Sequence, residues 1–191
     1  MKRTLFALLW AAPLAAVAAC PPLLDHQVPA LMGGKLNLCE YSGKAVVVVN
    51  TASECGFTPQ YKTLQKLWQD YRAKGLVVVG FPSDDFNQEL DKDADVASFC
   101  QSNYGVSFPM SSRVKVRGSD AHPFYQALAE ASGTTPKWNF YKYVVSADGK
   151  TVTLDTPENV AALEYMTEIY QALGGVRNVY GFASTFQSGN L

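Results

Sequence analysis

Two continuous apolar runs stand out along the chain, at Ala45–Asn50 and Leu76–Phe81. Neither run alternates between apolar and polar positions, as a strand with one solvated face would. Both runs have the length of a strand and are rich in valine, a residue that favours strands. The pattern therefore predicts two strands that are buried on both faces of a sheet.

The segment between these runs has the periodicity of a helix. Thr58 and Pro59 indicate its start, with the threonine hydroxyl as the cap and proline at the first helical position. Gly75 indicates its end. The apolar positions at helical spacing are Tyr61, Leu64, Leu67, Trp68 and Tyr71. Strand, helix and strand in this order predict a right-handed parallel crossover.

The rest of the pattern predicts two hairpins and three further helices. Gly33-Gly34 divides short apolar stretches before the first strand, and Asp148-Gly149 separates two β-rich runs. Residues 106–110, "VSFPM", read as another extended stretch. The predicted helices cover residues 96–101, 123–131 and 157–173. Together these elements predict one α/β domain with a central mixed sheet, helices on both faces and an N-terminal β-hairpin.

Residues 1–19 have the pattern of a secretory signal peptide. Lys2 and Arg3 precede an apolar run, and small residues follow in an A-x-A pattern that ends at Ala18. An uncleaved N-terminal anchor is the alternative. No other stretch approaches about 18 apolar residues, so we expect an exported, soluble mature protein in the periplasm, without a membrane span. The chain then divides into a signal peptide at 1–19, a folded domain at 20–175 and a C-terminal tail at 176–191.

Composition and charge add little about partners. A chain of 191 residues with 48% hydrophobic content can fill one core. The formal net charge is -1 and the basic residues are scattered, which does not favour nucleic acid or an anionic membrane surface as a partner. His26 and His122 have no neighbours at metal-ligand spacing, and we expect them to be surface or capping residues.

Four cysteines carry most of the candidate chemistry: Cys20, Cys39, Cys55 and Cys100. Disulfides persist in an exported protein, and four cysteines allow three pairings. No C-x-x-C motif is present, which disfavours a zinc ribbon and a dithiol enzyme acting on the disulfides of other proteins. We favour a disulfide between Cys20 and Cys39, which both fall near the N-terminal hairpin. In the alternative, residues 17–20 form a lipobox, Cys20 carries a lipid anchor and Cys39 is unpaired.

Cys55 follows a predicted buried strand and precedes a predicted helix. Reactive groups gather at this position in open α/β sheets, where backbone N–H groups and the helix dipole favour an anion. Such a position can lower the pKa of a cysteine thiol from about 8.5 into roughly the 3.5–7.5 range, and the thiolate is the nucleophilic form. Position alone leaves open whether Cys55 is reactive or an inert buried residue.

Four segments resemble motifs of the glutathione peroxidase family, in its cysteine form. They are "NTASECGFTPQY" (50–61), "GFPSDDF" (80–86), "FCQSNYGVSFPM" (99–110) and "KWNFYKY" (137–143). The motifs occur in the family's order and spacing, and the resemblance covers roughly residues 23–173. It implies a thioredoxin-like fold, which agrees with the architecture predicted from the pattern.

The resemblance also implies roles for Cys55, Trp138 and Asn139. Cys55 is at the position of the peroxidatic cysteine, whose thiolate attacks the O–O bond of a hydroperoxide and becomes a sulfenic acid. Trp138 and Asn139 match an indole and an amide that hydrogen-bond this sulfur without adding charge. Taken without the other motifs, the pair would read as a core tryptophan beside a turn asparagine.

Cys100 aligns with the resolving cysteine of thioredoxin-dependent members. In that role it forms a disulfide with Cys55, which a dithiol then reopens. We expect local unwinding of the Cys100 helix, because helix and strand would otherwise hold the two sulfurs apart. The alternative is that Cys100 is a buried hydrophobic residue.

The sequence departs from the family at "GFPSDDF". The family usually reads FPCNQF, with the glutamine as a further donor to the sulfur, but here Asp85 stands at that position and Ser83 replaces the cysteine. An ionised carboxylate disfavours a nearby thiolate. We therefore expect Asp85 to be protonated, turned away or bridged by water, and a solvated loop acid is the alternative.

The resemblance implies a thiol peroxidase that reduces hydrogen peroxide or organic and lipid hydroperoxides, without a metal or organic cofactor. A resolving cysteine favours a thioredoxin-like protein over glutathione as the reductant. The stretch 131–138 lacks the insertion that tetrameric members use for assembly, which implies a monomer with an open site. The alternative function, suggested by Asp85, is a thioredoxin-fold redox sensor or binding module with weak turnover.

Overall fold

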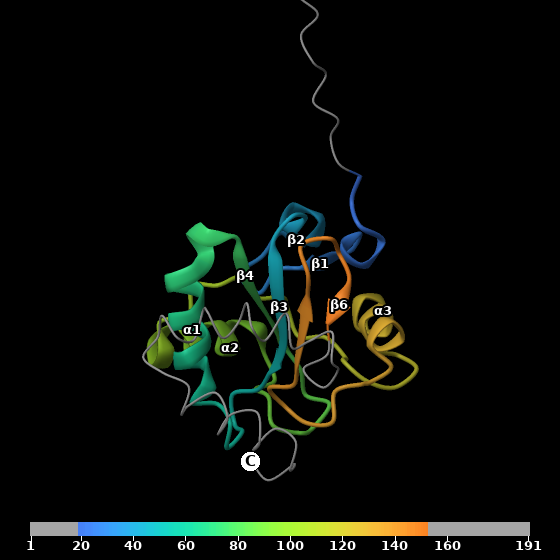
Figure 1. Cartoon of the computed structure of the whole chain (residues 1–191). Coiled ribbons are helices and arrows are strands. Elements are labelled where there is room, and N and C mark those ends of the chain that lie inside the picture. Colours follow the sequence, from blue (N-terminus) through green and yellow to red (C-terminus); the bar gives the residue numbers. More distant parts are fainter. Residues whose placement is uncertain (1–18, 153–191) are drawn as a thin grey trace, which may run out of the picture.

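The computed structural model describes residues 19–152 (Figure 1). The predicted signal peptide up to residue 18, the predicted helix at 157–173 and the predicted tail therefore lie outside the described residues. Within residues 19–152 a four-stranded sheet has helices on both faces, and a two-stranded hairpin lies near the N-terminal end of these residues. This is the predicted α/β architecture.

The central sheet has the strand order β4-β3-β5-β6. Its strands are β3 (Ala45–Thr51), β4 (Leu76–Pro82), β5 (Lys142–Val145) and β6 (Thr151–Val152). β3 pairs parallel with β4 and antiparallel with β5, so the sheet is mixed, as predicted. β5 and β6 pair antiparallel around Gly149, whose φ of 82° is readily adopted by glycine, which confirms the second hairpin.

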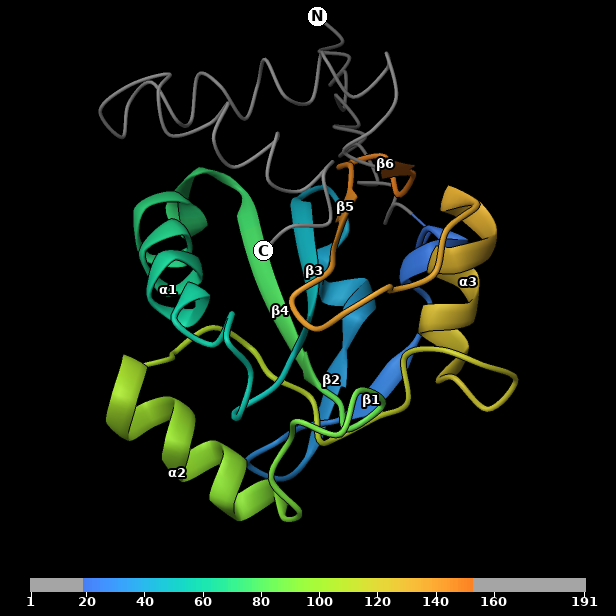
Figure 2. The ribbon, with the colours of Figure 1, turned by 90° about the horizontal axis from the view of Figure 1, so that it is seen from below.

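The two faces of the sheet pack against different helices (Figure 2). Val47 and Val49 of β3 belong to an apolar cluster with residues of α1 (Gln60–Tyr71) and α2 (Asp93–Tyr104). Val46 and Val48 belong to a second cluster with α3 (Pro123–Ser132). Burial on both faces explains why the β3 and β4 sequences do not alternate.

Helix α1 begins at Gln60, one residue later than predicted, and the predicted cap is wrong. Pro59 occupies the N-cap position, and no side chain caps the helix there. The Thr58 hydroxyl makes other hydrogen bonds within the preceding turn, described below. A short 3-10 helix, η3 (Arg72–Lys74), follows α1, and Gly75 with a φ of 91° ends it as predicted.

The other two helices fit the prediction to different degrees. α3 begins at the predicted Pro123, and the His122 side chain accepts a hydrogen bond from the Phe124 N–H, which confirms a capping role for this histidine. α2 is longer than the predicted 96–101. It begins at Asp93, and Gly105 with a φ of 61° ends it.

Residues 106–110 run beside β4 without forming a strand of their own. Met110 makes a single parallel bridge to Gly80, whose N–H donates to the Pro109 carbonyl (2.9 Å). Pro109 has no N–H to extend the pairing. Gly80 permits the close approach, because a Cβ atom there would lie 3.1 Å from the Phe108 ring and 3.2 Å from Met110.

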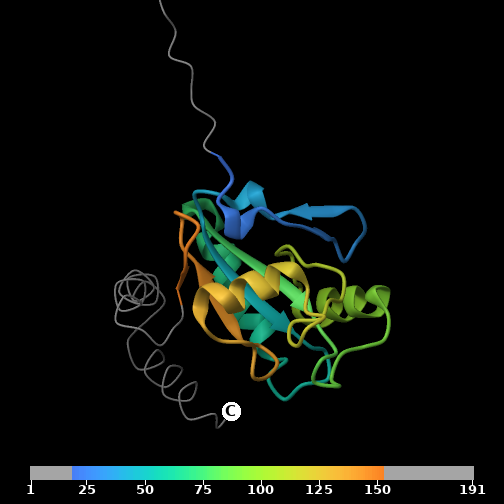
Figure 3. The same cartoon turned by 90° about the vertical axis from the view of Figure 1, so that its right-hand side faces the viewer.

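The N-terminal segment packs beside one end of the sheet (Figure 3). It contains η1 (Pro22–Leu24), β1 (Gln27–Pro29), β2 (Lys35–Asn37) and η2 (Leu38–Tyr41). β1 and β2 pair antiparallel, which confirms the predicted hairpin.

A disulfide joins Cys20 to Cys39, with a Cα–Cα distance of 5.6 Å. It links the segment before η1 to η2, as predicted. In this structure the Cys20 sulfur is therefore not available for a lipid.

Replacing both Cys20 and Cys39 by serine is expected to lower the free energy of unfolding by about 3 kcal/mol. The reason is that the disulfide spans a sequence separation of 19 and restricts the unfolded chain. Urea unfolding of the two proteins measures the difference. Adding a reductant should destabilise the wild type by a similar amount and leave the double variant unchanged. Equal stability of the oxidised wild type and the variant would contradict the prediction.

Candidate active site

Cys55 lies in the turn between β3 and α1 and is a free thiol. Its side chain is 8% exposed, and its Sγ accepts a hydrogen bond from the Phe57 N–H (3.4 Å). Thr58 braces this turn: its Oγ1 accepts from the Cys55 N–H (3.1 Å) and donates to the Ala52 carbonyl (2.9 Å). The hydroxyl that the sequence predicted as a helix cap thus ties Thr58 to the backbone between Ala52 and Cys55.

Trp138 and Asn139 lie on the connection that leads into β5. Asn50, near the end of β3, holds this connection twice. Its Nδ2 donates to the Trp138 carbonyl (3.0 Å), and its own carbonyl accepts from the Phe140 N–H (2.6 Å). These bonds bring Trp138 and Asn139 to the end of β3 from which the Cys55 turn departs.

The two side chains differ in exposure. Asn139 is buried, at 3% exposed, whereas Trp138 is 45% exposed and is not a core residue. The indole ring lies 5.2 Å from the ring of Phe86, which the Arg117 guanidinium covers at 4.3 Å from the ring centroid. Trp138 is therefore an exposed apolar side chain beside the buried Phe86, whose ring also contacts the Arg117 cation.

The carboxylate of Asp85 is turned toward residues 116–117. Its Oδ2 accepts from the Val116 N–H (2.6 Å) and the Arg117 N–H (3.1 Å), and Arg117 Nη2 donates to the Asp85 carbonyl (2.7 Å). The Asp85 N–H donates to Ser83 Oγ (3.3 Å). The sequence left open whether Asp85 is protonated, turned away, bridged by water or a solvated loop acid. The structure favours a carboxylate that is turned away, because its hydrogen bonds go to the loop at residues 116–117.

Gln88 was not identified from the sequence. Its Oε1 accepts from Asn139 Nδ2 (2.9 Å), and its carbonyl accepts from the Glu54 N–H (2.9 Å). Glu54 directly precedes Cys55. Gln88 therefore connects Asn139 to the Cys55 turn. The feature of the sequence that could have indicated Gln88 is its position just after the "GFPSDDF" motif.

Glu89 is a second residue that the sequence did not single out. It is 6% exposed, and its Oε1 accepts from the Ser53 N–H (3.0 Å) and the Leu90 N–H (2.9 Å). Burial raises the pKa of Glu89, and these hydrogen bonds and the charge of Arg113 oppose that rise. The buried carboxylate thus holds the backbone two residues before Cys55.

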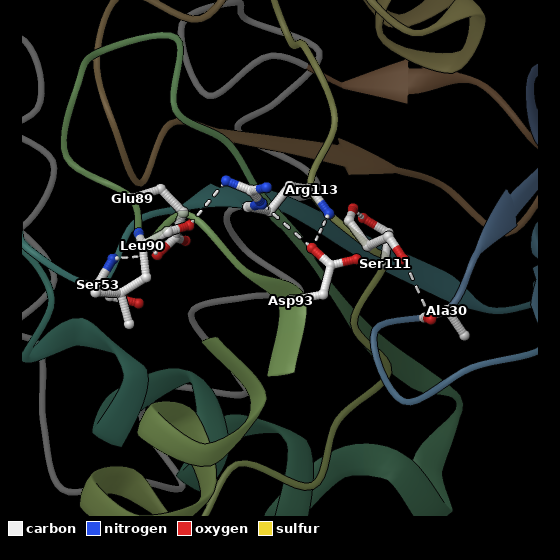
Figure 4. Close-up of polar contacts among 8 residues, drawn as sticks. Ala30, Ser53, Glu89, Leu90, Asp93, Ser111 and Arg113 are labelled. Carbon is white, nitrogen blue, oxygen red and sulfur yellow. Dashed lines mark hydrogen bonds and ion pairs between the residues drawn. The ribbon is translucent and has the colours of Figure 1, made fainter. Parts of the chain in front are cut away.

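The contacts continue from Leu90 to helix α2 (Figure 4). Arg113 Nη1 donates to the Leu90 carbonyl (3.0 Å), and its Nε donates to Asp93 Oδ1 (3.3 Å). Asp93 is the first residue of α2. A chain of hydrogen bonds therefore runs from the Cys55 turn to the start of the helix that carries Cys100.

Cys100 is a free thiol on α2 and is 2% exposed. Burial raises its pKa to about 11; the Tyr61 hydroxyl opposes this rise and the charge of Glu89 adds to it. At neutral pH the Cys100 thiol is therefore protonated. Cys55 and Cys100 belong to the same apolar cluster.

Lys142 is buried on β5 at this end of the sheet. Its Nζ donates to Gln60 Oε1 (2.7 Å) and to the Phe140 carbonyl (2.6 Å), and burial lowers its pKa to about 7. Lys142 thus ties the first residue of α1 to the residue that follows Asn139. In the sequence, the feature that could have indicated Lys142 is the presence of a lysine within an otherwise β-rich run.

Within residues 19–152, no three His, Cys, Asp or Glu side chains are grouped so that they could hold a metal ion. In the same part of the chain, none of the helices combines the length and apolar character needed to cross a membrane.

The fold and the site together define a thioredoxin-like protein with a free cysteine in the turn before α1. The model of a family described as glutathione peroxidase matches residues 23–129. The chain is 43% identical over 139 residues to the glutathione peroxidase of Lactococcus lactis, covering 70% of this chain and 88% of that protein. It is 38% identical over 148 residues to the hydroperoxy fatty acid reductase gpx1 of Synechocystis, covering 70% and 88%.

A solved structure, "Crystal structure of Trgpx in apo form", has a TM-score of 0.56 and 34% identity, and the match covers 73% of this chain and 91% of that one. The chain belongs to the glutathione peroxidase family. Its activity is accordingly that of a thiol peroxidase, which uses a hydroperoxide and a thiol reductant.

Replacing Asp85 by alanine is expected to lower the free energy of unfolding by about 1–3 kcal/mol, because the Val116 and Arg117 N–H groups lose their acceptor. The peroxidase rate of the folded protein should stay within about twofold of the wild type, since the carboxylate is engaged away from the Cys55 turn. Urea unfolding and peroxide consumption measure the two effects. Asp91→Ala, at an exposed position, serves as the control. A large loss of rate at unchanged stability would show that Asp85 acts in the chemistry.

Proposed function

We propose that the protein reduces hydrogen peroxide and organic hydroperoxides through a Cys55 sulfenic acid and a Cys55–Cys100 disulfide. The observation that carries this proposal is the free Cys55 thiol in the turn before α1, whose Sγ accepts the Phe57 N–H. Backbone N–H groups and the N-terminal end of a helix favour a thiolate. Cys100, buried and protonated at neutral pH, is the less suitable first nucleophile.

In the first step the Cys55 thiolate attacks the terminal oxygen of the hydroperoxide. An S–O bond forms and the O–O bond breaks, and the departing oxygen takes up a proton and leaves as an alcohol or as water. Cys55 becomes a sulfenic acid. Trp138 and Asn139 serve as N–H donors at the sulfur, because neutral donors stabilise the developing charges without adding a countercharge.

In the second step the Cys100 sulfur attacks the sulfenic sulfur of Cys55. An S–S bond forms, the S–O bond breaks, and water leaves with the thiol proton. A disulfide requires Cβ atoms about 3.5–4.5 Å apart, so the buried, helical Cys100 must first be released by local opening of α2. A dithiol then returns both cysteines to thiols by supplying two electrons and two protons.

The exposed surface around Trp138 supports larger substrates, including lipid hydroperoxides. Trp138 supplies exposed apolar area and packs against the buried Phe86, and the similar Synechocystis protein is named for hydroperoxy fatty acids. We propose a thioredoxin-like protein as the reductant, because a resolving cysteine presents it with a disulfide. The short connection from α3 to Trp138 supports a monomer.

A redox sensor or binding module is the second candidate. Asp85 at the glutamine position was the observation in its favour, but its carboxylate binds the Val116 and Arg117 N–H groups. Stopped-flow measurement of Cys55 oxidation separates the two candidates. An oxidation rate of Cys55 no faster than that of a free thiol would refute the peroxidase proposal.

Peroxide consumption by the wild type is expected to be faster with a thioredoxin system than with glutathione. Cys55→Ser should lose more than about 100-fold in rate with either reductant, because it removes the nucleophile. Cys100→Ser should still be oxidised rapidly once, but should lose turnover with thioredoxin. Undiminished thioredoxin-dependent turnover of Cys100→Ser would show that the resolving role is wrong.

We also propose export to the periplasm with removal of residues 1–19. The Cys20–Cys39 disulfide supports this location, because disulfides persist in oxidising compartments. The intact mass of the mature protein should correspond to a chain beginning at Cys20, with two hydrogens lost for the disulfide. Diacylglycerol on Cys20 would instead establish a lipoprotein, and a mass that includes residues 1–19 would exclude cleavage.

A further inference from the structure

We propose that Gln88 is the positioning residue for Asn139, and that it sets the direction in which the Asn139 amide faces the Cys55 turn. This inference rests on the proposed function of Cys55 as the nucleophile. It assigns Gln88 a role in the rate of Cys55 oxidation without direct contact with the reacting atoms.

The first observation is the sparse anchoring of a buried amide. Asn139 is 3% exposed, and its Nδ2 donates to Gln88 Oε1 (2.9 Å). Its Oδ1 has no hydrogen-bond partner among residues 19–152. The Gln88 bond is therefore the side-chain hydrogen bond that fixes the rotation of the Asn139 amide within the described part of the chain.

The second observation is the chemistry that this bond leaves available. An amide nitrogen carries two hydrogens, and one of them is used by Gln88. With the amide held in this rotation, the other N–H has a fixed direction. A donor with a fixed direction stabilises a sulfur or oxygen anion better than one that must be reoriented during the reaction.

The third observation connects Gln88 to Cys55. The Gln88 carbonyl accepts from the N–H of Glu54, the residue before Cys55 (2.9 Å). The backbone of Gln88 is thus bound to the nucleophile's turn while its side chain is bound to Asn139. Asp85 cannot make the same link, because its carboxylate is engaged with residues 116–117.

The backbone beside both amides is unusual. Asn87, which precedes Gln88, has a φ of 55°, and Phe140, which follows Asn139, has a φ of 62°. Asparagine tolerates this left-handed conformation, whereas phenylalanine rarely adopts it. The Phe140 ring packs edge-on against Tyr61 at 5.3 Å, which helps to hold it. Such conformations are concentrated at functional sites, and here they flank the Gln88–Asn139 contact on both sides.

A double-mutant cycle tests the proposal with Gln88→Ala, Asn139→Ala and the double variant. Stopped-flow oxidation of Cys55 by hydrogen peroxide should slow about 10-fold in Gln88→Ala and more in Asn139→Ala. The double variant should be no slower than Asn139→Ala alone, because Gln88 acts through Asn139. The pH profile of Cys55 alkylation should move to higher pH in all three variants. Gln88→Met, which keeps the side-chain length, should behave like Gln88→Ala.

Gln69→Ala is the matched control, since Gln69 is exposed on α1, far along the helix from its start. It should oxidise at the wild-type rate. Wild-type rates in both Gln88 variants, with Asn139→Ala and Cys55→Ser impaired, would overturn the role of Gln88 and leave the proposed function standing. Effects that multiply in the double variant would also overturn it. Slow oxidation of wild-type Cys55 would instead refute the proposed function itself.

Discussion

The pairing of β3 on both of its edges determines where the candidate site residues lie. β3 pairs with β4 on one side and with β5 on the other, and its valines contribute to both apolar clusters. Asn50 near its end binds the backbone of Trp138 and Phe140, and the turn that carries Cys55 follows directly. A change of strand register would separate Asn50 from these partners. The relative position of the two segments therefore depends on the same pairing that builds the core.

Elements with a local signal were predicted from the sequence, and elements that depend on distant partners were not. The valine runs of β3 and β4, the glycine turns and the Pro123 helix start were predicted correctly because their signals lie within the elements themselves. The first turn of α2 is polar, so no apolar periodicity could reveal where this helix begins. Its first residue, Asp93, is instead contacted by Arg113, which is distant in sequence. The Thr58 hydroxyl was misassigned because turn contacts to Ala52 and Cys55 compete with helix capping.

The candidate site residues divide in the same way, into those with a signal of their own and those that depend on distant partners. Family motifs identified Cys55, Cys100, Trp138 and Asn139, whose catalytic roles stay predictions. The links between them were not predictable, because Gln88 and Glu89 lie in an irregular segment whose side-chain directions follow no period. The direction of Asp85 likewise depends on the N–H groups of a loop about thirty residues away in sequence. Sequence therefore identified the groups with chemistry better than the groups that position them.

The two helices on the Cys55 face of the sheet differ in how firmly they are held, and this difference fits the proposed cycle. α1 buries five side chains, whereas α2 buries two, Val96 and Cys100. The tie from Arg113 to the start of α2 is partly exposed, and exposed ion pairs contribute little stability. Opening α2 therefore exposes fewer buried side chains than opening α1 would. Elements with few buried contacts open at the lowest free energy. In the proposed cycle, Cys100 on α2 can therefore move toward the turn while α1 and β3 keep Cys55 in place.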